Sequence, residues 1–110
     1  MEFLRDVYER RRKYFDNLDY YLEEIKKIVK ERVPDAEIYL YGSVVDGDYS
    51  IGLSDIDIGI VSDELSDRDK KLELFGELTK KFFESPFEFH IFTKEQWKSC
   101  RRFIGKFRKI

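Results

Sequence analysis

The sequence predicts an α+β fold of helix and sheet layers, formed by a single domain over residues 1–110. Some segments carry apolar residues at every third or fourth position, which is typical of amphipathic helices, and others alternate with a period of two, which is typical of strands. Pro34 and Pro86 fall between these segments, and proline ends a helix. The expected order is helix, strand, helix, strand, helix, strand, helix.

The helical patterns cover both ends and the middle of the chain. Residues 3–32 have the spacing of one long amphipathic helix or of two in tandem, ended by Pro34. Residues 66–83 repeat this spacing after an acidic start, which suits a helix N-terminus. We place a last helix near residues 94–104, after a capping sequence at Thr93, and assign the whole basic segment 94–110 to it.

Three short apolar runs predict strands at residues 37–41, 55–61 and 87–92. Gly42 turns the chain after the first of them. Ser43 follows it and is well placed to cap a short helix across residues 44–49.

The second strand carries two acidic residues, Asp55 and Asp57, on either side of one isoleucine. Residues two apart point to the same face of a strand, so these carboxylates lie side by side while Ile56 and Ile58 point into the core. Adjacent like charges are tolerated when one is protonated or when a cation lies between them. Oxygen ligands of this kind suit Mg²⁺ or Mn²⁺, so the pair predicts a divalent metal site.

The third strand adds Glu88 and His90 on one face and phenylalanines on the other. If its polar face is aligned with that of the second strand, Glu88 becomes a third carboxylate of the cluster; otherwise Glu88 is a solvent-exposed residue. For His90 a structural, hydrogen-bonded role is the favoured interpretation.

Composition places the chain among globular proteins without membrane spans, since its apolar runs are far shorter than the roughly 18 residues that span a bilayer. Met1 to Lys13 is too charged for a signal peptide. The single Cys100 cannot form an internal disulfide, and one cysteine with one histidine cannot build a four-ligand zinc site. We therefore expect a cytoplasmic protein.

The formal net charge is −2, yet residues 94–110 hold seven Lys or Arg against one acid. This cluster could contact the phosphates of a nucleic acid or nucleotide, or an acidic partner. A solvated helix end explains it equally well.

Gly42 and Ser43, followed after eleven residues by Asp55, Ile56 and Asp57 in a strand, resemble the polymerase-β-type nucleotidyltransferase superfamily. The small size resembles its minimal nucleotidyltransferase branch. The resemblance covers residues 35–93 and implies the polymerase-β-like fold, a small mixed sheet with helices packed on it.

The resemblance also implies roles for the matching residues. Asp55 and Asp57 would hold two Mg²⁺ (or Mn²⁺) ions that bridge the phosphates of an NTP, most naturally ATP. Glu88 would be the third metal-binding and catalytic carboxylate, which helps to activate the acceptor hydroxyl. Gly42 and Ser43 would bind the triphosphate through the turn.

The middle of the turn motif departs from the family, because Val44, Val45 and Asp46 follow Ser43 and Asp46 stands where a cation is common. Two interpretations follow. The chain transfers a nucleoside monophosphate, AMP, to a hydroxyl on a partner protein, or it is a catalytically silent antitoxin of a toxin–antitoxin pair. The resemblance to the minimal branch implies a HEPN-like toxin as the partner. Because 110 residues leave little room for an acceptor domain, we expect either such a complex or a homo-oligomer.

Overall fold

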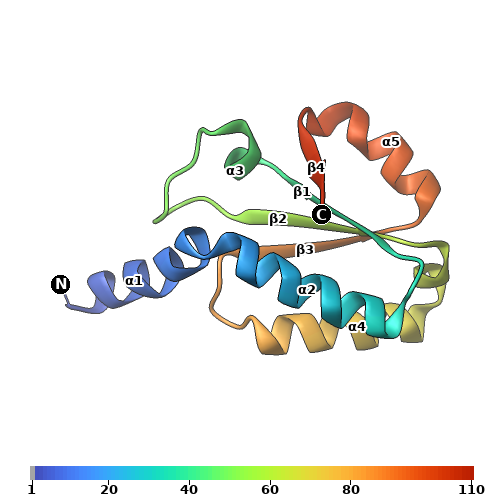
Figure 1. Cartoon of the computed structure of the whole chain (residues 1–110), viewed down its shortest axis with the longest axis horizontal. Coiled ribbons are helices and arrows are strands. Elements are labelled where there is room, and N and C mark those ends of the chain that lie inside the picture. The colour runs from blue at the N-terminus through green and yellow to red at the C-terminus, as the bar shows by residue number, and fades with distance from the viewer. Residues whose placement is uncertain (1) are drawn as a thin grey trace.

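The computed structural model describes residues 2–110 and confirms the α+β architecture. One mixed sheet lies at the centre, α2 and α4 pack on one of its faces, and α5 packs on the other (Figure 1). The elements in chain order are α1 (Glu2–Asp16), α2 (Leu18–Arg32), β1 (Glu37–Tyr41), α3 (Ser43–Asp46), β2 (Ile56–Val61), the 3₁₀ turn η1 (Asp63–Ser66), α4 (Arg68–Lys81), β3 (Phe87–Phe92), α5 (Lys94–Ile104) and β4 (Phe107–Lys109).

The four strands lie in the order β3-β2-β1-β4. β1 runs antiparallel to both of its neighbours, whereas β2 and β3 are parallel. The parallel pair needs a crossover connection, and α4 supplies it. The carboxyl ends of the two parallel strands therefore point the same way, and their side chains alternate in step.

The main core confirms the alternation expected for β2. Ile56, Ile58 and Ile60 are fully buried against α2 and α4. Burying a side chain of this size contributes roughly 1.5–3 kcal/mol to stability. The same alternation turns Asp57 to the opposite face.

A smaller cluster forms on that opposite face, where Trp97 of α5 packs with Tyr41 and Val61. Gly59 makes this approach possible, because a Cβ at that position would lie only 3.3 Å from both the Trp97 and the Tyr41 rings. The indole stacks on Tyr39 with ring centroids 4.6 Å apart. α5 is thereby fixed next to the polar face of β2.

The N-terminal helical pattern forms two helices, α1 and α2, which meet at Asn17. The second pattern begins with the turn η1, and Asp67 then caps α4 by accepting hydrogen bonds from the N–H groups of Asp69 and Lys70. At Thr93 the capping box expected for the last helix is present, with Gln96 as its partner.

Two expectations are wrong. The helix after Gly42 covers only Ser43–Asp46, with Gly42 itself in the cap position, and Gly47 in the left-handed conformation ends it. The basic segment 94–110 is not one helix: α5 ends at Ile104, Gly105 turns the chain with a φ of +81°, and residues 107–109 pair with β1 as strand β4.

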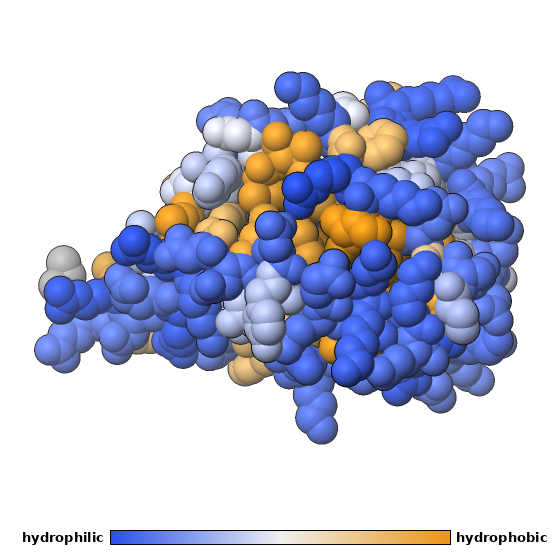
Figure 2. Space-filling model, in the orientation of Figure 1, coloured by the Kyte–Doolittle hydropathy of each residue, from blue (hydrophilic) through white to orange (hydrophobic). Residues whose placement is uncertain are grey.

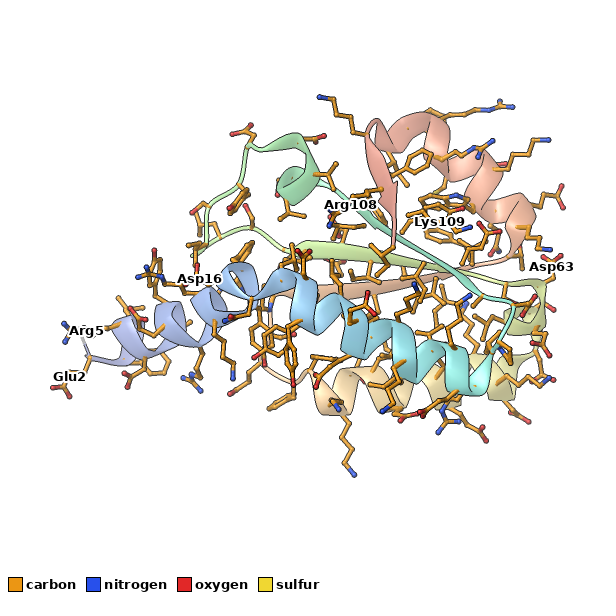
Figure 3. All side chains as sticks on the ribbon, viewed as in Figure 1. Glu2, Arg5, Asp16, Asp63, Arg108 and Lys109 are labelled. Carbon is orange, nitrogen blue, oxygen red and sulfur yellow. The ribbon has the colours of Figure 1, made fainter. Side chains whose placement is uncertain are left out.

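Polar side chains cover most of the surface in Figure 2, and apolar ones gather in a band above α2. A groove of about 330 Å³ is lined by the apolar residues Leu18, Leu40, Val44 and Val45, together with Asp19 and Arg108. In Figure 3, Arg108 and Lys109 of β4 lie near the middle of the view, whereas Glu2 and Arg5 mark the outer end of α1.

Within residues 2–110, no helix has the length and apolar character needed to cross a membrane.

Candidate functional site

The centre of the candidate site is the pair Asp57 and Glu88, which are direct neighbours in the parallel register of β2 and β3. Both side chains leave the sheet on the face opposite the isoleucine core. One ligand atom from each of Asp57, Glu88 and His90 lies within 4.8 Å of the other two. The alignment on which the Glu88 hypothesis depends is therefore present.

His90 is the residue that sequence reasoning left out of the cluster. Its Nε2 lies 3.2 Å from Oδ1 of Asp57 and 3.6 Å from Oε1 of Glu88. Its register partner on β2 is Gly59, so no β2 side chain stands opposite the imidazole. The only signal in the sequence is that His90 follows Glu88 by two residues, and a lone histidine at that spacing does not by itself indicate a site.

Asp55 lies outside this trio. It is exposed and precedes the first residue of β2, so it stands at the rim of the site rather than inside the sheet. Its carboxyl group is nevertheless close enough to Glu88 to raise the pKa of that residue. The structure thus brings Asp57, Glu88 and His90 together, and leaves Asp55 beside Glu88.

The closeness of these acidic groups changes the pKa values of Glu88 and His90. Partial burial, the neighbouring Asp55 carboxyl group and the nearby Asp57 charge raise the pKa of Glu88. The hydrogen bond to Asp57 raises the pKa of His90, because it stabilises the imidazolium, and this outweighs the opposing effect of burial. Both shifts favour the protonated forms of Glu88 and His90, in which the repulsion among the acids is smaller.

Gly42 lies against the side of Asp57 that faces away from His90. Its φ is +87°, a conformation that side chains rarely adopt. A Cβ on Gly42 would overlap Oδ2 of Asp57. The turn between β1 and α3 can therefore lie directly against this carboxylate only because residue 42 is glycine.

Ser43 follows as the first residue of α3 and is half-buried. The N–H groups of Val45 and Asp46 bond back to the Gly42 carbonyl, which makes the turn compact. Within residues 2–110 the Ser43 hydroxyl has no hydrogen-bond partner, and so it can donate to a ligand above Asp57. Asp46 ends the helix, is exposed, and adds a negative charge there.

The donor set fits a divalent cation. No Lys or Arg within residues 2–110 forms an ion pair with Asp57 or Glu88, and His90, which can offset their charge only in its protonated form, is the one basic side chain beside them. Neighbouring ligands of an octahedral ion at about 2.1 Å stand roughly 3 Å apart, close to the separations of His90 from the two carboxylates. Asp55, Asp57 and Glu88 supply oxygens that suit Mg²⁺ or Mn²⁺, and His90 supplies one nitrogen.

A hollow of about 380 Å³ opens beside Glu88 and His90 at the edge of β3. Phe82, Phe83 and Ser85 also line it. A larger hollow, of about 700 Å³, lies between α5 and the end of β3 and contains none of the site carboxylates. Glu88 can therefore be reached from the β3 edge.

Two basic residues of β4 form ion pairs away from the candidate site. Lys109 pairs with Glu37 at 3.2 Å, and Arg108 approaches Asp19 at 3.9 Å. Lys98, Arg101, Arg102 and Lys106 have no ion pair among the described residues.

Comparison with known proteins agrees with this geometry. A family model for the nucleotidyltransferase domain matches residues 22–110, which leaves α1 outside the match. A crystal structure of a protein assigned as a nucleotidyltransferase is 67% identical, with a TM-score of 0.75, and the match covers 82% of this chain and 97% of that one. A second such structure, from Sulfolobus solfataricus, has a TM-score of 0.54 at 17% identity over 94% of this chain and 84% of that one, which is a likeness of fold. A search of curated proteins finds no matching relative.

Proposed function

Because the chain belongs to the nucleotidyltransferase domain family, we propose that it transfers the nucleoside monophosphate of an NTP, AMP from ATP, to a hydroxyl group. The observation that supports this most directly is the register of Asp57 with Glu88, together with the Gly42 turn that lies against Asp57. This arrangement places carboxylates next to a turn with a free hydroxyl, as a phosphate-binding metal site requires.

The bond changes are simple. The acceptor oxygen attacks the α-phosphorus, the bond from that phosphorus to the bridging oxygen of the β-phosphate breaks, and pyrophosphate leaves. Asp55, Asp57 and Glu88 would hold the divalent ions, whose charge stabilises the oxygens of the transferred phosphoryl group. Ser43 would donate its hydroxyl to the triphosphate.

We propose that Glu88 accepts the proton of the acceptor hydroxyl. Glu88 lies in direct register with Asp57, and a carboxylate within hydrogen-bond reach of a hydroxyl group can accept its proton. Glu88 also lines the hollow at the β3 edge, from which an acceptor would arrive.

The acceptor that we propose is a hydroxyl on another protein, bound as a second copy of the chain or as a HEPN-like partner. In favour of this, residues 2–110 form one sheet with its helices, and the hollow beside Glu88 lies at the outer edge of that sheet. A small molecule held only at such a sheet edge would be poorly enclosed.

The experiment is transfer of label from each of the four NTPs to the protein and its co-purified partner, with Mg²⁺ or Mn²⁺. We expect one added nucleotide mass on the partner, and loss of the product by orders of magnitude in Asp57→Asn. Asp6→Asn, an exposed acid of α1, is the matched control and should retain full activity. No labelling by any NTP would overturn the proposal.

The second candidate is a catalytically silent antitoxin, which Asp46 favours because it adds a negative charge to the turn meant for a triphosphate. It requires a tight complex that neutralises a toxic partner equally well with the wild type and with Asp57→Asn. Loss of neutralisation in Asp57→Asn, together with labelling of the partner by the wild type, would exclude it.

A further inference from the structure

The loop between α3 and β2, residues 47–55, leads directly into Asp55 and has no helix or strand of its own. A local turn gives it some order, because the Ser54 N–H donates to the Ser50 carbonyl at 2.8 Å and the Ser54 hydroxyl accepts from the Ser50 N–H at 2.9 Å. Most of its side chains are exposed. Its position therefore depends on what it contacts.

Arg11 of α1 makes the main polar contacts with this loop. Its Nε donates to the Ile51 carbonyl at 2.8 Å, and its Nη2 donates to the Ser54 carbonyl. The second carbonyl belongs to the peptide bond between Ser54 and Asp55. Because a peptide unit is planar, holding that oxygen limits the orientation of the backbone at Asp55.

Aromatic contacts from the same helix support the loop on both sides of Arg11. Phe15 stacks on Tyr49 with ring centroids 5.2 Å apart and an interplanar angle of 3°. A Cβ on Gly52 would lie 3.9 Å from Tyr8, so the ring sits against the backbone there. In Figure 1 the loop descends from α3 to meet α1 before it enters β2.

The backbone on the other side of Asp55 is fixed by the sheet, since the Ile56 N–H donates to the Pro86 carbonyl at 2.8 Å. Asp55 itself is exposed and lies outside the trio of Asp57, Glu88 and His90. The Arg11 guanidinium on one side and the sheet on the other thus set where its carboxylate points.

We propose that Arg11 is a positioning residue that holds the backbone of Asp55 in place for metal and nucleotide binding, which makes α1 part of the catalytic apparatus. This rests on the nucleotidyl transfer proposed above. α1 lies outside the residues that the family model matches, and Tyr14 is its one buried residue. Phe15 packs at the edge of the core, and Arg10 forms an ion pair with Glu84 at 2.9 Å. The contacts of Arg11 are the ones that connect α1 to the backbone of Asp55.

The competing explanation is that Arg11 merely attaches α1 to the rest of the molecule. The two differ in what Arg11→Ala does. A positioning role lowers kcat with little change in thermal stability, whereas an attachment role lowers activity only as far as the folded fraction falls. Arg12→Ala is the matched control, because Arg12 is on the same helix and its one ion pair within residues 2–110 is with Asp16.

The first measurement is kinetic. We expect Arg11→Ala to lower kcat on the order of 100-fold, the effect of a displacement of about 1 Å at a catalytic centre, and Arg12→Ala to leave kcat unchanged. Added guanidinium at low millimolar concentration should restore part of the loss in Arg11→Ala only, since it can bind the two vacated carbonyls. In an Asp55→Asn background, Arg11→Ala should add less than a twofold loss, because the two residues act through one carboxylate.

The second measurement does not need turnover, so it separates this proposal from the proposed function. Hydrogen exchange of residues 50–56 should accelerate in Arg11→Ala, and Mn²⁺ binding with a non-hydrolysable NTP should weaken about tenfold, an effect typical of a lost supporting contact at a metal site. If the wild type transfers no nucleotide, the proposed function fails while these two changes still test Arg11. Unchanged exchange and binding, or losses in kcat that multiply with those of Asp55→Asn, would overturn the proposal.

Discussion

Nε2 of His90 and Oδ1 of Asp57 face each other at 3.2 Å across two parallel strands. Oδ2 of the same aspartate lies against the Gly42 turn. The two oxygens of Asp57 are thus directed to different neighbours, one to an imidazole and one to the expected phosphate site. The contact with His90 and the contact with the Gly42 turn lead to the predictions below.

The first concerns metal preference. Replacing His90 with Gln removes a nitrogen ligand while keeping a hydrogen-bond donor for Asp57. We expect Zn²⁺ affinity to fall about tenfold or more, since imidazole suits that ion, and Mg²⁺ affinity to change far less. Competition titration of both ions on the wild type and His90→Gln measures this. Equal effects on the two ions would mean that His90 only orients Asp57.

The second concerns pH. The folded pKa of His90 is raised above the ordinary 6.5, so its contribution to stability is complete below that value and is lost as the pH rises through the raised pKa. With metal removed by a chelator, the unfolding free energy of the wild type relative to His90→Gln should be larger near pH 6 than near pH 9. We expect a difference on the order of 1 kcal/mol, because the pair is partly exposed. A difference that grows toward high pH would contradict the assignment.

The third concerns Gly42. Gly42→Ala must either strain the turn at a φ of +87° or push Asp57 aside. We expect a loss of roughly 1–3 kcal/mol in stability and of nearly all activity. Gly76→Ala is the control, since nothing lies near a Cβ there in the interior of α4. It should be stabilising by about 0.5–1 kcal/mol.

The fourth concerns Ser43. Ser43→Ala should raise the KM for the NTP about tenfold or more, the worth of one hydrogen bond to a charged group. The melting temperature should be unchanged, because the hydroxyl has no partner within residues 2–110. Ser99→Ala, on the exposed side of α5, serves as the control. A normal KM in Ser43→Ala would place the triphosphate elsewhere.

Much of this site follows from local patterns. The period of two in β2 and β3 separates Ile56 and Phe89 from Asp57 and Glu88, and only the hydrophobic effect is needed to decide which face is buried. That these strands are direct neighbours in register depends on contacts distant in sequence. The superfamily resemblance supplied that knowledge, and spacing alone could not.

The remaining differences between the expectations and the structure have physical causes that a short stretch of sequence does not show. Strand β4 has three exposed residues with no alternation, and it forms because β1 offers hydrogen bonds from far along the chain. The helix pattern of the N-terminal segment continues past Asn17, so the spacing could not choose between one helix and two. His90 joined the cluster through a register partner, Gly59, whose small size matters only once the strands are paired.

β4 also bears on how the chain folds during synthesis. All the site residues precede position 91, but β1 gains its second neighbour only from residues 107–109 and from Ile110, whose N–H bonds the Ile38 carbonyl at 2.9 Å. A chain that stalls or is clipped before residue 107 would keep the whole site and leave the inner strand β1 with an open, apolar edge that other chains can join. The finished molecule replaces that edge with a very short strand bearing Arg108 and Lys109, and charge on a short outer strand discourages aggregation. Residues 107–110 therefore protect the sheet and lie outside the candidate metal site.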